Sequence, residues 1–165
     1  MQPFVPILMG SQSDMSHAEA IAQTLAEFGI SAELRIGSAH KTPAHVLKII
    51  ENYESDPRPK VYITIAGRSN ALSGFVDAQV SAPVIACPPL SSTFSGADIY
   101  SSLRMPGGVA PAVVLEPSGA ALLAAKILAL GNSEIKQRLL EFQQDKRDTI
   151  LKDDTAIQSA NAGVQ

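Results

Sequence analysis

Short apolar runs alternate along the chain with segments in which apolar residues recur every three or four positions. Runs that are wholly or almost wholly apolar, such as 4–9 and 61–66, are typical of strands buried on both faces of a parallel sheet, whereas 32–36 alternates apolar and polar residues. Segments with helical spacing, such as 18–28, predict amphipathic helices between these strands. This alternation indicates an α/β fold with an open, mostly parallel sheet and helices on both faces.

Turn and cap residues set the limits of the individual elements. Strands are expected at 4–9, 32–36, 61–66, 83–87 and 112–115. Helices are expected at 18–28, 43–53, around 75–76, 97–105, 117–130 and 133–152. Gly29 is a stop signal for the first helix, and Thr42 followed by Pro43 is a start signal for the second. We therefore predict one three-layer, flavodoxin-like domain at 1–152, followed by a flexible tail at 153–165.

Composition narrows the class of protein. Hydrophobic residues make up 45% and charged residues 18% of the chain, and the formal charge of −3 argues against a nucleic-acid surface. The most apolar stretch, 120–130, is too short to span a bilayer and contains Lys126. Cys87 has no partner for an internal disulfide, and 1–9 lacks a basic leader, so we expect a cytoplasmic protein without membrane contact.

A polar turn, 10–14, follows the first predicted strand. Gly10 allows a ligand to approach the backbone, Ser11 and Ser13 supply hydroxyl groups, and free amides at a helix start attract an anion. Asp14 would repel a phosphate, so we expect it to accept a hydrogen bond from a ribose hydroxyl. The same residue types also cap helices, and either Ser13 or Ser16 could do so here. The turn alone therefore fits a phosphate site and an ordinary helix cap equally well.

The loop after the second predicted strand contains His40 and Lys41, among small residues that include Ser38. Ligands of open parallel sheets bind outside the carboxyl ends of the strands, where this loop is expected. A histidine beside a lysine at this edge suits proton transfer near neutral pH, and Lys41 could neutralise a phosphate or carboxylate. An isolated surface histidine without a function is the alternative.

The loop after the third predicted strand, 66–71, offers exposed amides and the polar side chains of Arg68, Ser69 and Asn70. Such donors could hold a carboxylate or CO2, although a capped helix start explains them as well.

The other candidate residues give weaker signals. His17 and His45 fall within helical periods and are expected to face solvent, and no cluster suggests a metal site. Cys87 ends an apolar strand, where a packed thiol is expected rather than a nucleophile. Three further residues could line a pocket or lie on a surface helix, and the sequence leaves them undecided: Asp98, Tyr100 and Arg104.

Taken together, the loops resemble those of the aminoimidazole ribonucleotide (AIR) carboxylase family of purine biosynthesis. The matching motifs are Gly-Ser-x-Ser-Asp at 10–14, Ser-Ala-His-Lys at 38–41, Ala-Gly-Arg-Ser-Asn at 66–70, Ala-Cys-Pro-Pro at 86–89 and Ser-Ser-Leu-Arg-Met-Pro at 101–106. Each motif is weak by itself, but their order and spacing match the family over about residues 4–150.

The resemblance implies a role for each loop. His40 falls on the position of the general acid/base, and the expected substrate-binding residues are Ser11, Ser13, Asp14, Ser38, Lys41, Ser69, Asn70 and Ala71. The first five of these would hold the ribose phosphate, and the last three CO2 or the new carboxylate. Family members need no metal, biotin or ATP to attach the carboxyl group, so no cofactor is expected. They are homo-oligomers with shared active sites, which implies a tetramer or octamer.

The family has two branches, and two motifs resemble the one that adds CO2 directly to AIR (class II): His40-Lys41 and Arg68-Ser69-Asn70. The other branch is a mutase that rearranges N-carboxyaminoimidazole ribonucleotide, and it stays open as an alternative. A non-catalytic flavodoxin-like nucleotide-binding module, such as a flavin carrier, is a rival of another class. Flavin sites usually stack the ring on aromatic side chains, but the chain has no Trp and only 5% aromatic residues.

Overall fold

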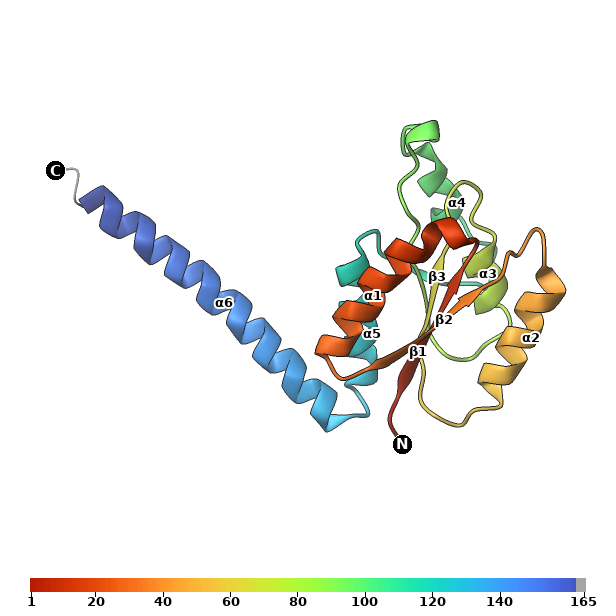
Figure 1. Cartoon of the computed structure of the whole chain (residues 1–165), viewed down its shortest axis with the longest axis horizontal. Helices are drawn as coiled ribbons and strands as arrows, with labels where there is room; N and C mark the ends of the chain where they lie inside the picture. Colours follow the sequence, from red (N-terminus) through yellow and green to blue (C-terminus); the bar gives the residue numbers. More distant parts are fainter. Residues whose placement is uncertain (163–165) are drawn as a thin grey trace.

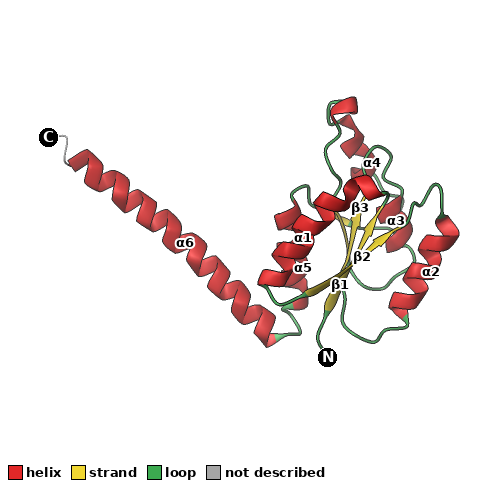
Figure 2. Cartoon of the chain, in the orientation of Figure 1, coloured by secondary structure: helices red, strands yellow, loops and turns green. Residues whose placement is uncertain are grey.

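A five-stranded sheet forms the centre of the computed structural model, which describes residues 1–162. The strands are β1 (Phe4–Met9), β2 (Ser31–Ile36), β3 (Tyr62–Ile65), β4 (Val84–Ala86) and β5 (Ala112–Val113). All neighbouring strands are parallel, in the order β2-β1-β3-β4-β5. The strands, yellow in Figure 2, lie between the red helices. This is the flavodoxin-like order, and the predicted fold class is confirmed. The order reverses between β1 and β3, where such sheets bind ligands at their carboxyl edge.

Helices cover both faces of the sheet. On one face lie α1 (Met15–Glu27) and α5 (Pro117–Leu128), and on the other lie α2 (Pro43–Glu54) and α3 (Leu72–Asp77) (Figure 1). Successive residues of β1 point to opposite faces, so Val5 and Ile7 join the core under α1 while Phe4 and Leu8 join the core under α2. Two hydrophobic cores therefore hold the central strands in place.

The start of α1 differs from the prediction. A 3-10 turn (Gln12–Asp14) precedes the helix, so Ser13 lies in that turn and Ser16 lies inside α1. Neither serine is the cap: Ser11 caps the 3-10 turn in a capping box with Asp14, whose carboxylate accepts a hydrogen bond from the backbone N–H of Ser11, and Asp14 is the residue before α1. At the other end of α1 the predicted stop is confirmed: Gly29 has a φ of 71°, which favours glycine.

The helix predicted at 97–105 is also broken. A 3-10 turn (Ala97–Ile99) leads into the single-turn helix α4 (Tyr100–Leu103). Within this segment the hydroxyl of Ser101 donates a hydrogen bond to the backbone carbonyl of Asp98 at 2.7 Å. A serine side chain that binds the local backbone in this way competes with helical hydrogen bonding.

The last helix, α6 (Ser133–Ala162), continues well past its predicted end at Lys152. The prediction was wrong because residues 153–162 include neither Gly nor Pro, and side-chain bonds such as Gln158 Nε2 to Asp154 Oδ2 (2.7 Å) support the helix. Its first turns bury Ile135 and Leu139, and the rest projects away from the body (Figure 1). Residues 163–165 of the predicted tail lie outside the described residues.

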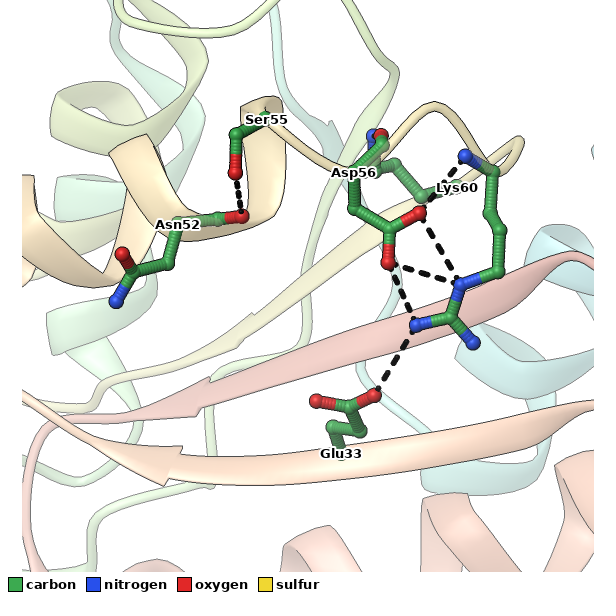
Figure 3. A network of polar contacts seen from close by, with 6 residues as sticks. Glu33, Asn52, Ser55, Asp56 and Lys60 are labelled. Atoms are coloured by element: carbon green, nitrogen blue, oxygen red, sulfur yellow. Dashed lines mark hydrogen bonds and ion pairs between the residues drawn. The ribbon is translucent and has the colours of Figure 1, made fainter.

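A charged cluster lies at the amino edge of the sheet. Arg58 Nη2 is 2.7 Å from Asp56 Oδ2 and 3.5 Å from Glu33 Oε1, the two carboxylates labelled in Figure 3. The guanidinium carbon of Arg58 lies 3.9 Å from the centre of the Phe4 ring. The hydrogen bonds from Arg58 hold the pKa of Asp56 below its usual range. Lys60 Nζ donates to the backbone carbonyl of Asp56 at 2.7 Å. The cluster fastens the segment before β3 to β2.

Candidate active site

A cavity of about 770 Å³ opens at the carboxyl edge of the sheet, where the loops after β1, β2, β3 and β4 meet. Its lining residues are Gly10, Ser11, Ser13, Asp14, Ser38, Ala39, His40, Lys41, Ala66, Gly67, Arg68, Ser69, Leu72 and 89–92. Of the predicted site residues, the structure therefore brings together those of the first two loops and Ser69. It leaves Asn70 and Ala71 out of the lining.

Hydrogen bonds within the 10–14 turn fix its shape. Asp14 Oδ2 accepts from the N–H of Ser11 at 3.1 Å and from its hydroxyl at 3.3 Å, and the hydroxyls of Ser11 and Ser13 are 2.6 Å apart. The N–H of Gly10 donates to the carbonyl of Ile65, which joins the turn to β3. The turn is thus both a helix cap and a wall of the cavity, so the two interpretations of its sequence do not exclude each other.

The 38–42 loop is closed from within and presents its charged side chains outward. Thr42 Oγ1 accepts from the N–H of Ser38 at 3.0 Å, and Ser38 Oγ accepts from the N–H of Lys41 at 3.2 Å. Gly37 lets this loop approach α2, because a Cβ there would lie only 2.8 Å from Val46 Cγ2. His40 and Lys41 are exposed and make no side-chain hydrogen bond or ion pair with another described residue. Both side chains are free to meet a ligand.

The 66–70 loop is held from behind by the segment 98–102. Arg68 has a φ of 59°, a left-handed backbone that a non-glycine residue adopts at some energetic cost. Its N–H donates to Asp98 Oδ2 at 2.8 Å, and its carbonyl oxygen lies 3.1 Å from the hydroxyl oxygen of Ser101. This assigns Asp98, which the sequence left undecided, to the support of the loop.

Asn70 is turned into the protein. Its side chain is 4% exposed, donates to Ser102 Oγ at 2.9 Å and accepts from the N–H of Ser73 at 3.1 Å. Because its amide is occupied in this way, Asn70 shapes the loop from within. Tyr100 and Arg104 are exposed and also lie outside the cavity lining.

The fourth wall of the cavity was assigned no binding role from the sequence, although the family motif at 86–89 ends at Pro89. Pro89, Leu90, Ser91 and Ser92 follow β4 and face the three other loops. Their signal was position alone: a polar loop directly after a parallel strand lies at the same edge as the other binding loops.

His17 does not face solvent, contrary to the prediction. It is half-buried, and its Nε2 lies 3.2 Å from Cys87 Sγ. Burial lowers the pKa of His17, although its contact with Cys87 and the carboxylates of Asp14 and Glu116 act in the opposite direction. Cys87 is fully buried, as predicted for a packed thiol, and burial with the nearby Glu116 raises its pKa to about 12. His45 is exposed, as predicted.

Two features are absent from residues 1–162: a metal-binding cluster and a helix able to cross a bilayer. No group of three or more His, Cys, Asp or Glu side chains is arranged to hold a metal ion. None of the described helices combines the length and the apolar character that crossing a bilayer requires.

Comparison with known proteins gives a consistent result. The AIR carboxylase family profile matches residues 4–149. A phosphoribosylaminoimidazole carboxylase of Treponema denticola is 57% identical over 157 residues, covering 95% of this chain and 99% of the relative. One from Archaeoglobus fulgidus is 55% identical over 92% of this chain and 83% of the relative. The rat bifunctional carboxylase/succinocarboxamide synthetase is 38% identical, and the match covers 95% of this chain and 37% of that protein.

A solved structure agrees with these relatives. The crystal structure of Treponema denticola PurE superposes with a TM-score of 0.92 at 58% identity, covering 93% of this chain and 98% of that one. Both the fold and nearly the whole length are therefore shared with a protein of high sequence identity. The chain belongs to the AIR carboxylase family.

Proposed function

We propose that this protein catalyses the reversible carboxylation of AIR by CO2 to 4-carboxy-5-aminoimidazole ribonucleotide, a step of de novo purine biosynthesis in the cytoplasm. One observation carries the proposal: the side chain of His40, which has no partner among residues 1–162, shares a cavity with the 10–14 turn and with Arg68 and Ser69. A proton-transfer group, an anion-binding turn and donors for a carboxylate therefore converge on one space.

In this scheme the ribose phosphate binds to the 10–14 turn, with Ser11, Ser13, Ser38 and Lys41 as its contacts. The amides at the start of a helix and a lysine ammonium are both suited to a phosphate. The carboxylate of Asp14 borders the same space and accepts a hydrogen bond from the ribose. These contacts direct the imidazole ring toward His40.

The chemical step then requires one proton transfer. The electron-rich ring carbon attacks CO2, and the new carbon–carbon bond leaves a tetrahedral carbon that still carries its hydrogen. His40 removes that proton, and the electron pair of the broken C–H bond restores the aromatic ring. In the reverse direction the protonated His40 returns the proton to the same carbon. Because the ring supplies the electron pair, neither ATP nor a cofactor takes part.

The loop after β3 stabilises the carboxyl group. Arg68 and Ser69 line the cavity, and the cation and hydroxyl are donors for the negative charge that develops on the oxygens of CO2. Asn70 and Ala71 contribute through the shape of the loop, because Asn70 is bound to Ser73 and Ser102.

The assay that tests this function supplies AIR together with CO2 or bicarbonate and no ATP. We expect carboxylated product, formed faster in the first seconds when dissolved CO2 is added than when bicarbonate is added, because CO2 is the species attacked. A reaction without enzyme measures the background. Turnover of N-carboxyaminoimidazole ribonucleotide alone would contradict direct carboxylation and identify the mutase, and inactivity on both would contradict the enzyme class.

We further propose that copies of the chain assemble through α6 into a tetramer or octamer. Beyond its first turns the helix exposes apolar side chains, among them Ile150 (67% exposed), Leu151 (64%) and Ile157 (61%). Burying such residues against a second copy would remove apolar surface from water.

Sedimentation velocity tests this assembly. We expect a species several times the 17.4 kDa of one chain, and Leu151→Glu should shift it toward monomer because a charge would enter the apolar contact. Lys152→Glu, at the neighbouring position, is the matched control and should leave the assembly intact. A wild-type protein that sediments only as a monomer would contradict the proposal.

A further inference from the structure

One partly buried contact joins two walls of the cavity, and neither of its two residues lines the cavity. His17 lies in the first turn of α1, and its Nε2 is 3.2 Å from the sulfur of Cys87, directly after β4. The same sulfur lies 3.7 Å from the backbone carbonyl of Leu115, which follows β5. Three separate segments therefore meet at the Cys87 sulfur.

The donors and acceptors at this sulfur can be assigned. The raised pKa of Cys87 keeps the thiol protonated at neutral pH, so it has a single hydrogen to donate. The carbonyl of Leu115 can only accept, and it takes that hydrogen. His17 must then donate its Nε2–H to a sulfur lone pair. The lowered pKa of His17 favours a neutral ring, and Asp14 and Glu116 are the charged groups that act on it. All groups at the sulfur are thereby satisfied.

Each end of this hydrogen bond leads directly into the cavity. Upstream of His17 the chain forms the 10–14 turn, and downstream of Cys87 it forms the 89–92 loop; both contribute lining residues. Among the described residues, no other side-chain hydrogen bond joins α1 to the segment that follows β4. The His17–Cys87 contact therefore ties these two walls directly to each other, in addition to the backbone hydrogen bonds by which Gly10 and Cys87 are each joined to β3.

We propose that His17 is a positioning residue for the phosphate end of the substrate. By donating to Cys87 it holds the 10–14 turn at a fixed distance from the 89–92 loop, so that the phosphate contacts are formed before the substrate arrives. This rests on the proposed function, in which the turn binds the ribose phosphate. Because His17 touches no reacting atom, its loss affects binding rather than the chemical step.

The test compares His17→Leu, which lacks the donor, with His17→Gln, whose amide nitrogen keeps a donor near the position of Nε2. We expect KM for AIR to rise about three- to tenfold in His17→Leu, the factor of one lost hydrogen bond, with kcat nearly unchanged. His17→Gln should restore most of the affinity. His45→Leu, on the exposed face of α2, is the control and should match the wild type. Equal KM values for the wild type and His17→Leu would overturn the proposal.

Cys87→Ala tests the contact from its other side and serves if His17→Leu does not fold. It should raise KM by a similar factor, and the double variant should resemble either single variant, because both remove one shared bond. A KM in the double variant that rises by the product of the two single-variant factors would contradict a shared bond. Calorimetry gives the affinity of each variant for ribose 5-phosphate, and this measurement does not depend on whether the wild type turns over AIR. Failure of the positioning role and failure of the proposed reaction are thus separate results.

Discussion

Replacing His40 with Asn should lower kcat for AIR carboxylation by about 10²- to 10⁴-fold, the usual contribution of a general acid/base. Asn fills a similar volume and makes hydrogen bonds, but it cannot take up the proton of the ring carbon. The side chain of His40 supports no other described residue, so neither the fold nor the phosphate contacts should change. Steady-state kinetics give kcat, and calorimetric titration with AIR gives the dissociation constant, which should stay close to the wild-type value.

The matched control is His45→Asn, which changes a second exposed histidine outside the cavity lining and should retain full activity. Incorporation of solvent deuterium at the reacting ring carbon of AIR, when the product is decarboxylated in D2O, offers a second measurement, since it requires the same proton transfer in reverse. Full activity of His40→Asn would remove His40 from the mechanism. A loss of AIR binding as large as the loss of kcat would indicate a binding role instead.

Lys41→Ala should weaken AIR binding by about 10- to 100-fold, which corresponds to the loss of one charge-assisted hydrogen bond. The exposed ammonium of Lys41 has no partner among the described residues, so removing it costs the folded protein no contact. Its whole effect should therefore appear in KM, with kcat at saturating AIR close to that of the wild type.

Lys41→Arg keeps the positive charge and should recover part of the affinity. Lys48→Ala, an exposed lysine on α2 that does not line the cavity, controls for a general change in surface charge. A fall in kcat at unchanged KM would contradict the phosphate-binding role and suggest that Lys41 acts on the reacting carboxyl group.

The pattern of the sequence predicted the layers and most elements correctly, because strands buried on both faces must be continuously apolar. β1 (Phe4–Met9) begins and ends where its apolar run does, and α2 starts at the predicted Pro43. Three site loops were located by the same logic, since the carboxyl ends of parallel strands lie at one edge. These successes concern features that short stretches of sequence determine by themselves.

The errors at the site concern residues whose environment comes from distant parts of the chain. His17 has a helical position that suggests a surface residue, but its partner Cys87 arrives from β4. Asn70 sits in a polar loop, yet Ser102 in α4 accepts its amide hydrogen and turns it away from the cavity. Such contacts cannot be predicted from the local sequence. The residues next to His17 and Asn70 in the chain are like those around an exposed polar residue, and the partner side chains come from distant segments.

The charged cluster around Arg58 lies at the opposite end of the central strands from the cavity. Effects of substitutions at well-separated sites generally add without influencing one another. A substitution of Glu33 or Asp56 can therefore change the stability of this end of the sheet while leaving the residues that line the cavity in place. The length of the central strands thus separates the charged cluster, which affects stability, from the cavity, which is proposed to affect catalysis.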